Sequence, residues 1–185
     1  MVVSSKLEPL AVTLRPARPA DAALLHAWRA EPTVRRHQPL SDASVADLRT
    51  DLARQRPEEL YRGQGERFQW IVVVAGEPAG WITLAVASWE HGIAEVGYAL
   101  GTPFQGRGVM TAALTQLFAE LFGHTALERI EARCSIDNFA SQAVLDKLGF
   151  TREGLLRGYF ELDGRRVDNH LFALLRTDYF GVDRS

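Results

Sequence analysis

Apolar positions recur at two different spacings along the first third of the chain, one typical of a strand and one typical of helices. Residues 12–15 have the pattern of a short strand, and two segments with apolar residues three and four positions apart follow it. These segments predict two helices, the first ending before Pro32 and the second ending near Pro57. Ser41–Asp42 is the expected N-cap of the second helix.

The rest of the chain is richer in β-branched and aromatic residues, which favour strands. The expected strands cover residues 68–75, 80–88, 93–100, 129–135, 154–162 and 167–175. Gly76-Glu77-Pro78 and Asp163-Gly164 are typical of turns. Gly97, inside a strand, indicates a bulge or a close backbone approach.

Two further helices are expected between these strands. Apolar residues at helical spacing predict one from about 108 to 122, with Gly123 placed to end it. A shorter helix is expected at 138–148. The order of elements predicts one domain over residues 1–185, with a core at about 12–176. Its fold class is mixed α/β (α+β), a sheet with helices on both faces.

Composition narrows the class of protein. Apolar residues make up 46% and charged residues 24% of the 185 residues, as in ordinary globular proteins, and the net charge is −2. A strongly basic nucleic-acid surface is therefore absent, and no nucleic-acid partner is expected. Cys134 is the single cysteine, so neither an internal disulfide nor a cysteine zinc site can form; Cys134 is expected in the core. The five histidines show no metal-ligand spacing, so no metal is expected.

The sequence carries no signal for a membrane or for secretion. Residues 1–14 lack a basic segment followed by a sustained apolar stretch. The longest apolar run, Trp70–Ala75, is far shorter than the roughly 20 residues of a bilayer-spanning helix. A cytoplasmic protein without a membrane partner is therefore expected.

The segment Gln105–Thr111 (Q-G-R-G-V-M-T) joins a predicted strand to the 108–122 helix. Its two glycines allow the backbone to approach a ligand closely, and a helix start offers free N–H groups and a positive dipole end to phosphate oxygens. A P-loop needs Gly-Lys-Ser/Thr, but this segment has no lysine. A dinucleotide fingerprint needs a third glycine where Thr111 stands. Taken alone, the segment fits a phosphate site and a ligand-free connection equally well.

A second candidate site lies at the start of the 138–148 helix. Asn138 and Ser141 are three residues apart and therefore share one helix face. Asn138 is also a favoured N-cap residue, and Ser141 can simply be exposed. By itself this pair favours the capping interpretation.

Together the two segments resemble the GCN5-related N-acetyltransferase (GNAT) superfamily, and more closely its RimJ/RimL-type protein N-terminal acetyltransferases. Gln105–Met110 is similar to the family's Q/R-x-x-G-x-G/A pyrophosphate loop, and 138–150 is similar to its N-x-x-S/A…K-x-G-F segment. The runs A-E-V-G-Y at 94–98 and E-G-x-L-R at 153–157 follow the RimJ/RimL pattern. The resemblance covers roughly residues 12–176.

Three positions depart from the superfamily pattern. Thr102 stands where many relatives have proline, with Pro103 one place later. Met110 replaces the usual Gly or Ala, as it does in many RimJ/RimL-type sequences. Leu145 stands where many members carry a tyrosine proposed as the general acid. That role is not transferred to Leu145, and Ser141 is the substitute that the resemblance implies.

The resemblance implies a GNAT-type fold with a largely antiparallel central sheet, and acetyl-coenzyme A as the cosubstrate. The N–H groups of Arg107–Thr111 are expected to hold the pyrophosphate. The edge of strand 96–100, splayed from strand 129–135, is expected to pair with the pantetheine amides. The full set of implied cofactor-binding residues is Leu100, Gln105, Gly106, Arg107, Gly108, Val109, Met110, Thr111 and Asn138.

The resemblance also assigns catalytic roles. Ser141 is expected to stabilise or protonate the departing thiolate. Glu95 is the first candidate for a water-relayed general base, from its family-like place in the 93–100 strand; a solvent-facing strand glutamate is the alternative. Backbone N–H groups near Tyr98–Leu100 are expected at the oxyanion.

Several residues have lesser roles in this interpretation. The weaker base candidates are Glu161, Asp168 and His170. Tyr159 is a candidate for orienting the acceptor. The run Arg35-Arg36-His37 is either a solvated turn or a rim of the acceptor site.

The implied reaction acetylates a primary amine, favoured as the α-amine of a protein or peptide N-terminus. An α-amine (pKa about 7.7–8.0) is far less protonated at pH 7 than a lysine amine (pKa about 10.4). Its deprotonation therefore depends less on a general base. The alternatives are a small-molecule amine, such as an antibiotic or polyamine, and a non-catalytic acyl-coenzyme A sensor. A homodimer is a further expectation, because dimers are common among the relatives.

Overall fold

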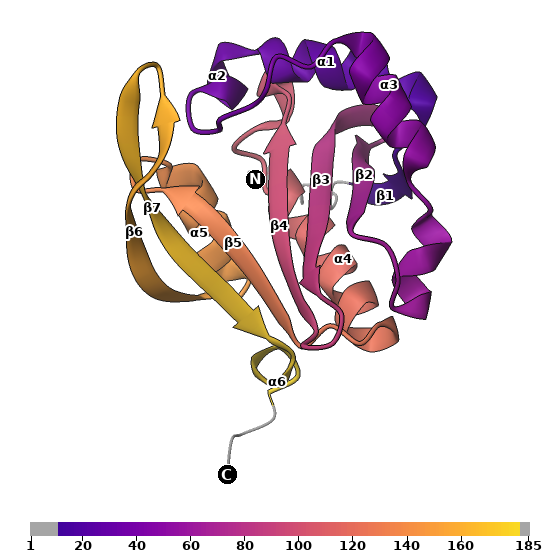
Figure 1. The fold of residues 1–185 in the computed structure, drawn as a ribbon, viewed down its shortest axis with the longest axis vertical. Helices are drawn as coiled ribbons and strands as arrows, with labels where there is room; N and C mark the ends of the chain where they lie inside the picture. Colours follow the sequence, from indigo (N-terminus) through magenta and orange to yellow (C-terminus); the bar gives the residue numbers. More distant parts are fainter. Residues whose placement is uncertain (1–10, 182–185) are drawn as a thin grey trace, which may run out of the picture.

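The computed structural model describes residues 11–181, which form one seven-stranded sheet with helices packed against it (Figure 1). The strand order is β1-β2-β3-β4-β5-β7-β6. The strands are β1 (Val12–Pro16), β2 (Arg67–Val74), β3 (Glu77–Ser88), β4 (Ile93–Leu100), β5 (Arg129–Ser135), β6 (Thr151–Leu162) and β7 (Arg165–Leu175). All neighbours pair antiparallel except β4 and β5, which are parallel. The expected mixed, largely antiparallel sheet is confirmed.

The helical elements lie before β2, between β4 and β6, and after β7. The α-helices are α1 (Ala22–Ala30), α2 (Pro32–Arg35), α3 (Val45–Arg54), α4 (Val109–His124), α5 (Phe139–Lys147) and α6 (Arg176–Tyr179). The 3-10 turns are η1 (Pro19–Asp21), η2 (Pro57–Arg62) and η3 (Thr102–Phe104). Within residues 11–181, no helix is long and apolar enough to cross a membrane.

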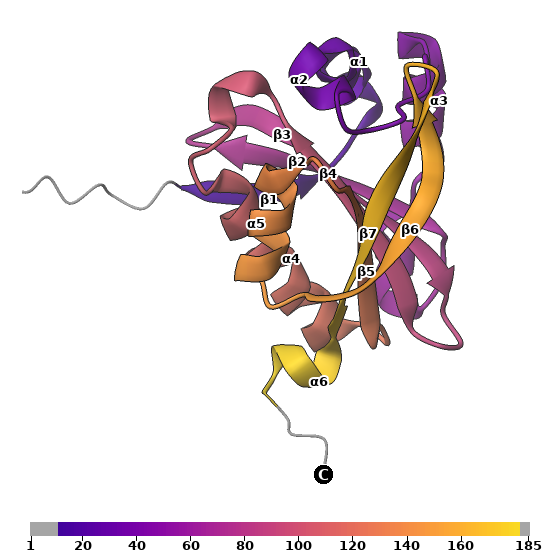
Figure 2. The ribbon, with the colours of Figure 1, turned by 90° about the vertical axis from the view of Figure 1, so that its left-hand side faces the viewer.

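Successive residues of the central strands pack on opposite faces of the sheet, as the period of two requires. On β2, Ile71 packs with the buried residues of α1 and α3, whereas Val72 packs with those of α4. Figure 2 shows α4 and α5 on one side of the sheet and α3 on the other. Helices on both faces are therefore confirmed.

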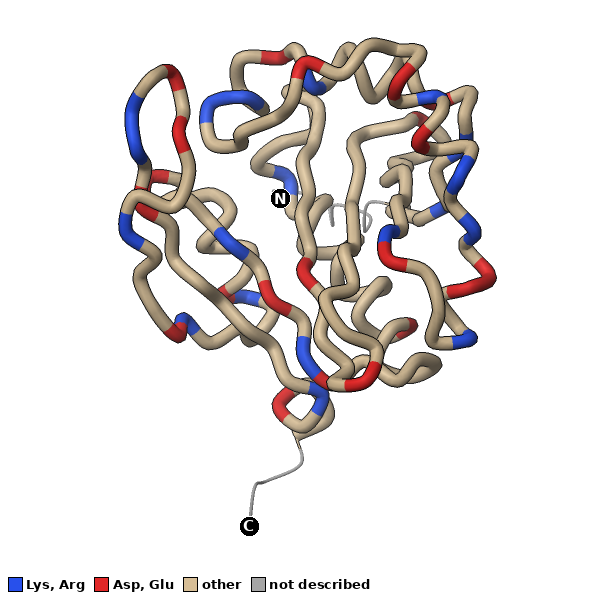
Figure 3. The backbone as a smooth tube through the Cα atoms, in the orientation of Figure 1, with Lys and Arg blue, Asp and Glu red and all other residues tan. Residues whose placement is uncertain are grey.

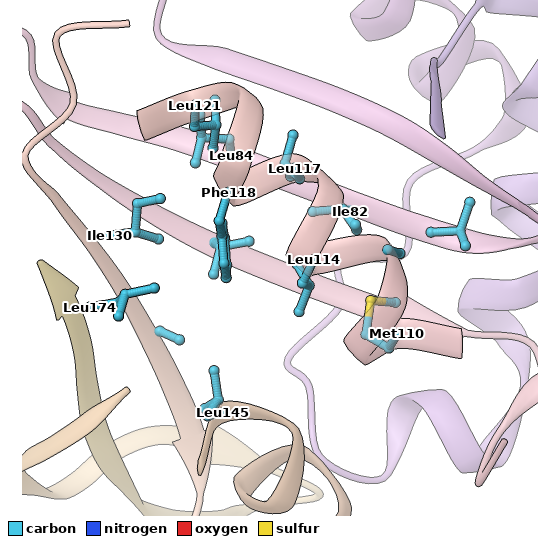
Figure 4. Close-up of a cluster of buried hydrophobic side chains, with 14 of the residues drawn as sticks. Ile82, Leu84, Met110, Leu114, Leu117, Phe118, Leu121, Ile130, Leu145 and Leu174 are labelled. Carbon is cyan, nitrogen blue, oxygen red and sulfur yellow. The ribbon is translucent and has the colours of Figure 1, made fainter. Parts of the chain in front are cut away.

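The larger core forms where α4 lies across β3 and β5 (Figure 4). Met110, Leu114, Leu117 and Leu121 are buried along one face of α4, as their spacing predicts. Each fully buried leucine stabilises the fold by roughly 1.5–3 kcal/mol through removal of apolar surface from water. This packing fixes the position of the α4 N-terminus, which matters for the site described below.

The expected end of α4 at Gly123 is wrong, because the helix continues to His124. Thr125 ends it instead: both its backbone N–H (3.0 Å) and its hydroxyl (2.7 Å) donate to the carbonyl of Leu121. The guanidinium of Arg176 donates to the carbonyls of Phe122 and Thr125. These distant donors satisfy the last carbonyls, so no glycine cap is needed.

The expected cap of α3 is also wrong. Ser44, not Ser41–Asp42, begins the helix: its hydroxyl accepts from the N–H of Asp47 (3.1 Å), and the Asp47 carboxylate accepts from the N–H of Ser44 (2.9 Å). Asp42 instead pairs with Arg35 (2.9 Å). A reciprocal capping box satisfies two helix-end donors, which the earlier serine does not do.

The turn between β2 and β3 is shorter than expected. Ala75 and Gly76 have φ angles of +49° and +87°, and Glu77 already belongs to β3. Two residues with positive φ suit a tight hairpin between twisted strands. The expected turn at Asp163-Gly164 is confirmed, with φ angles of +48° and +76°.

Strands β4 and β5 separate after a short parallel contact. Their pairing covers Ile93↔Arg129, Ala94↔Ile130 and Glu95↔Glu131, while β4 stays paired with β3 up to Leu100. In Figure 1 the two strands diverge toward the end that carries α2. Of the two expectations for Gly97, the bulge is wrong, since Thr83↔Gly97 is in regular register, and the close backbone approach stays a prediction. Gly97 lies on the free stretch of β4, with no described atom within 4 Å of its missing Cβ.

Candidate active site

The loop before α4 owes its shape to two glycines in left-handed conformation. Gly106 has φ +70°, and Gly108, the N-cap of α4, has φ +76°. The first helical bond runs from the N–H of Ala112 to the carbonyl of Gly108 (3.1 Å). The N–H groups of Val109–Thr111 precede that bond and therefore have no partner in the helix ladder. Together with the helix dipole, they form a site suited to phosphate oxygens.

Side chains anchor this loop to the rest of the fold. Val109 and Met110 are 1% and 5% exposed and belong to the core, which anchors the start of α4. The amide of Gln105 donates to the carbonyl of Leu100 (2.9 Å) and ties the loop to the end of β4. The loop is therefore held in place without any ligand.

A cavity of about 350 Å³ lies between this loop, the free end of β4 and the face of α5. It contains every expected cofactor-binding residue except Arg107, which is exposed beside it. The residues that line it are Thr33, Val34, His37, Gln38, Tyr98, Ala99, Leu100, Gln105, Gly106, Gly108, Val109, Met110, Thr111, Asn138, Ala140, Ser141, Ala143, Val144 and Lys147. The volume is within the usual range of small-molecule sites. We refer to it as the loop cavity.

Ser141 sits in the wall of the loop cavity on the first turn of α5. Asn138 is the N-cap of this helix, and its side-chain oxygen accepts from the N–H of Ser141 (3.1 Å). The hydroxyls of Ser141 and Tyr98 are hydrogen-bonded at 2.8 Å. Burial raises the pKa of Tyr98, so its phenol stays protonated at neutral pH. Leu145, one turn further along α5, is 0% exposed and packs in the core.

A second cavity of about 350 Å³ lies on the other side of Ser141, where β4 and β5 separate. It is lined by the exposed face of both strands and by the β6–β7 hairpin, including Glu95, Gly97, Arg133, Tyr159, Phe160 and Asn169. It shares His37, Gln38, Tyr98, Asn138 and Ser141 with the loop cavity. We call it the strand cavity; the two cavities meet at Ser141 and Tyr98.

Charged residues of opposite sign follow one another along one face of β5, and Arg133 is the one of them that lines the strand cavity. Arg129, Glu131 and Arg133 occupy every second position of β5 and therefore share one face of the strand. Figure 3 shows basic and acidic segments alternating along this part of the chain. Arg133 pairs with Glu95 across the opening and reaches Glu131 at 3.3 Å. Its guanidinium lies 5.6 Å from the ring centre of Tyr159. The Glu95 carboxylate is thus held in the wall of the strand cavity by an arginine.

The weaker base candidates lie outside the walls of both cavities. The Asp168 carboxylate accepts from the N–H of Gly158 (2.6 Å), a bond that stabilises the irregular part of β6. The His170 ring contacts Phe172 edge-on, with centroids 6.2 Å apart. Glu161 is exposed on β6. Of the four base candidates, Glu95 is the one that lines the strand cavity.

The segment around α2 contributes more to the site than its sequence indicates. His37 lines both cavities, and burial together with the nearby Arg36 lowers its pKa. The amide of Gln38 donates to the carbonyl of Tyr98 (2.8 Å). Gln38, Thr33 and Lys147 had no site assignment from the sequence. A four-residue helix is too short to show apolar periodicity, and no local signal marks Gln38.

Cys134 is buried on β5, as the sequence predicts. Its sulfur lies 3.5 Å from the carbonyl oxygens of Ser135 and Asn138. Burial raises the pKa of its thiol, which keeps it in the protonated form. Its environment is that of a structural rather than a nucleophilic cysteine.

Comparison with known proteins identifies the family of this chain. Residues 11–151 match the family model described as an acetyltransferase (GNAT) domain. The uncharacterized N-acetyltransferase p20 of Bacillus licheniformis is 32% identical over 170 residues, which cover 92% of this chain and 96% of p20. The [ribosomal protein uS5]-alanine N-acetyltransferase of Escherichia coli K12 is 34% identical over 84 residues, or 45% of this chain and 43% of that enzyme.

The fold of this chain is also similar to that of a solved structure. Mycobacterium smegmatis RimJ, in complex with a coenzyme A disulfide, superposes with a TM-score of 0.79 at 29% identity, covering 94% of this chain and 85% of RimJ. The chain therefore belongs to the GNAT acetyltransferase family and is an acyltransferase. Within that family, the resemblance to RimJ/RimL-type enzymes is confirmed.

Proposed function

We propose that this chain transfers the acetyl group of acetyl-coenzyme A to the α-amine of a protein or peptide N-terminus. The observation that carries the proposal is the meeting of two cavities at one hydroxyl pair, Ser141 and Tyr98. One cavity has a phosphate-binding helix start, and the other has a carboxylate, Glu95. A thioester and an amine that enter from opposite sides come together at Ser141.

The loop cavity fits acetyl-coenzyme A. Three N–H groups, those of Val109–Thr111, face the position for the diphosphate, and the left-handed glycines keep that approach free of side chains. The β4 edge beyond Glu95 has no strand partner on the β5 side. The side-chain amides of Gln38 and Gln105 occupy the carbonyls of Tyr98 and Leu100, and the other backbone groups of this edge can pair with the pantetheine amides. When bound, the cosubstrate supplies an activated acetyl group as a thioester.

Glu95 is the proposed general base. The amine must lose a proton to attack, and an α-amine is already partly neutral at pH 7. Arg133 orients the Glu95 carboxylate in the strand cavity, where it attracts the acceptor ammonium and takes up the proton through a water.

Ser141 and Tyr98 act at the leaving group. The carbon–nitrogen bond forms as the carbon–sulfur bond breaks, and negative charge develops on the sulfur. Either hydroxyl of the Tyr98–Ser141 pair can be the donor; when Tyr98 donates to the Ser141 oxygen, the Ser141 hydrogen is free to reach the sulfur. Removing Ser141 therefore slows turnover but leaves the diphosphate contacts intact.

The exit from the strand cavity favours an acceptor with a continuing chain. A further cavity of about 600 Å³ adjoins it and shares His37, Ser135 and Asn138 with it. Exposed apolar surface at Phe139 borders this exit. The residues that follow a peptide N-terminus can occupy such a path, whereas a short amine leaves it empty. The similarity to the [ribosomal protein uS5]-alanine N-acetyltransferase supports the same acceptor class.

The test is thiol release from acetyl-coenzyme A with a panel of acceptors: N-terminal peptides, polyamines and aminoglycosides. We expect release with peptides, and mass spectrometry should locate one acetyl group on the α-amine. Release with small amines alone contradicts the proposed acceptor. Tight binding without release by any acceptor indicates an acyl-coenzyme A sensor. A cytoplasmic location and a homodimer remain parts of the proposal.

A further inference from the structure

Two buried polar atoms stand out in the wall of the strand cavity. Among residues 11–181, Arg133 Nε and Asn169 Oδ1 are the buried side-chain nitrogen and oxygen atoms that lack a hydrogen-bond partner. Both residues line the strand cavity. Buried polar groups are nearly always paired in native proteins, so an unpaired donor and acceptor in one cavity call for an explanation.

The β5–β7 ladder brings the two residues together. Arg133 is opposite Leu171, and Ser135 is opposite Asn169. Arg133 and Asn169 are therefore diagonal neighbours on one face of an antiparallel pair, close enough for their side chains to contact a common group. Asn169 is 1% exposed, so bulk water does not satisfy its side chain.

We propose that Asn169 and Arg133 bind the first peptide group of the acceptor. Asn169 Oδ1 accepts from the N–H of the second residue, and Arg133 Nε donates to the carbonyl of the first. This inference rests on the proposed function, because it names the group that distinguishes an N-terminal peptide from other amines. A peptide group presents one donor and one acceptor, whereas a polyamine has no carbonyl to offer.

The rest of the Arg133 side chain supports this role. Its terminal nitrogens are engaged with Glu95 and Glu131, and its guanidinium lies against Tyr159. These contacts fix the direction of Nε within the wall. Replacing Arg133 also releases Glu95, so a change at Asn169 is the cleaner test.

The experiment compares two acceptors, a peptide and the same peptide with an ester in place of its first amide. The ester keeps the carbonyl and the α-amine but lacks the N–H that Asn169 is proposed to bind. We expect the protein to prefer the amide by about tenfold in kcat/KM, the effect of one lost hydrogen bond to a ligand. In Asn169→Leu the preference should fall to within about twofold, with the KM for acetyl-coenzyme A unchanged.

Ser135→Ala is the matched control. It removes a hydroxyl from the same wall, opposite Asn169, but that hydroxyl already accepts from the N–H of Asp137 (3.5 Å). The preference for the amide should survive this change. If Ser135→Ala abolishes the preference as fully as Asn169→Leu does, the effect reflects the shape of the wall and the proposal fails.

Thermal unfolding separates binding from a structural role. Leucine in place of an unpaired buried carboxamide should leave the Tm unchanged or raise it, because no hydrogen bond of the Asn169 Oδ1 atom is lost. A lowered Tm with an equal loss of activity on both acceptors overturns the proposal. So does equal use of amide and ester by the unaltered protein. No thiol release with any acceptor refutes the proposed function itself and this inference with it, and that result is seen before any ester is compared.

Discussion

The conformation of Gly108 allows a quantitative test of the phosphate-binding loop. Its φ of +76° and ψ of 2° are left-handed, and an L side chain there costs roughly 1–2 kcal/mol. A Cβ on Gly108 meets no described atom within 4 Å, so the penalty comes from the backbone and not from a clash. We expect Gly108→Val to relieve this strain by turning the loop, which also turns the N–H groups of Val109–Thr111.

The expected loss of cofactor affinity follows from those N–H groups. A hydrogen bond to a charged group contributes roughly 1.5–3 kcal/mol. Loss of one such bond weakens binding by at least about tenfold, since about 1.4 kcal/mol corresponds to a factor of ten. Isothermal titration calorimetry with acetyl-coenzyme A measures the change directly on the folded protein.

Gly76→Val is the matched control for this substitution. Gly76 has φ +87° in the turn between β2 and β3, outside both cavities, and its Cβ position is also free of neighbours within 4 Å. Both variants should lose similar unfolding free energy, but only Gly108→Val should lose affinity. A folded Gly108→Val protein that binds acetyl-coenzyme A as tightly as Gly76→Val does would refute the loop assignment.

Three further predictions concern the reacting groups and the stability of the fold. Ser141→Ala should lower kcat by about 10²-fold and leave the Kd for acetyl-coenzyme A within about twofold. An unchanged kcat in the thiol-release assay would show that Ser141 has no catalytic role. Glu95→Gln should lower kcat/KM for the acceptor by a similar factor, and an unchanged rate excludes Glu95 as the base. Paired 2.7 Å hydrogen bonds from Arg15 hold the pKa of Asp21 below its usual 3.8 in the folded protein. Their contribution to the unfolding free energy is therefore present above about pH 4, and it is lost as the pH falls through the lowered pKa of the folded state. Asp21→Asn should therefore lower the unfolding free energy at pH 7 by about 1–2 kcal/mol and flatten its decline in acid, as urea titrations can measure; equal acid sensitivity of the two proteins contradicts this.

The strands and long helices could be predicted from the sequence because their patterns of apolar and polar residues are local. The bounds predicted for β4 and β5, 93–100 and 129–135, agree with the structure, since β-branched and apolar residues in these runs pack against α4 on alternate positions. Apart from the bulge expected at Gly97, the errors lie at element ends. The end of α4 depends on Arg176, which lies more than 50 residues away in the sequence and donates to carbonyls that the local sequence leaves free.

The sequence predicted individual residues of the site but not how they are arranged in space. Gly108 and Ser141 each lie in a recognisable local pattern, and the family resemblance joined them. The bond between Tyr98 and Ser141 spans 43 positions, and the unpaired state of Asn169 depends on what surrounds it in three dimensions. Neither the Tyr98–Ser141 bond nor the unpaired Asn169 side chain can be predicted from a local sequence pattern. Both depend on which residues surround the side chain in the folded protein.

The most direct test of the account is a crystal structure of the protein with coenzyme A. The account predicts the diphosphate within about 3 Å of the backbone nitrogens of Val109–Thr111, and the sulfur beside the Ser141 hydroxyl where the two cavities meet. A diphosphate bound elsewhere, or a sulfur directed away from Ser141, would contradict it.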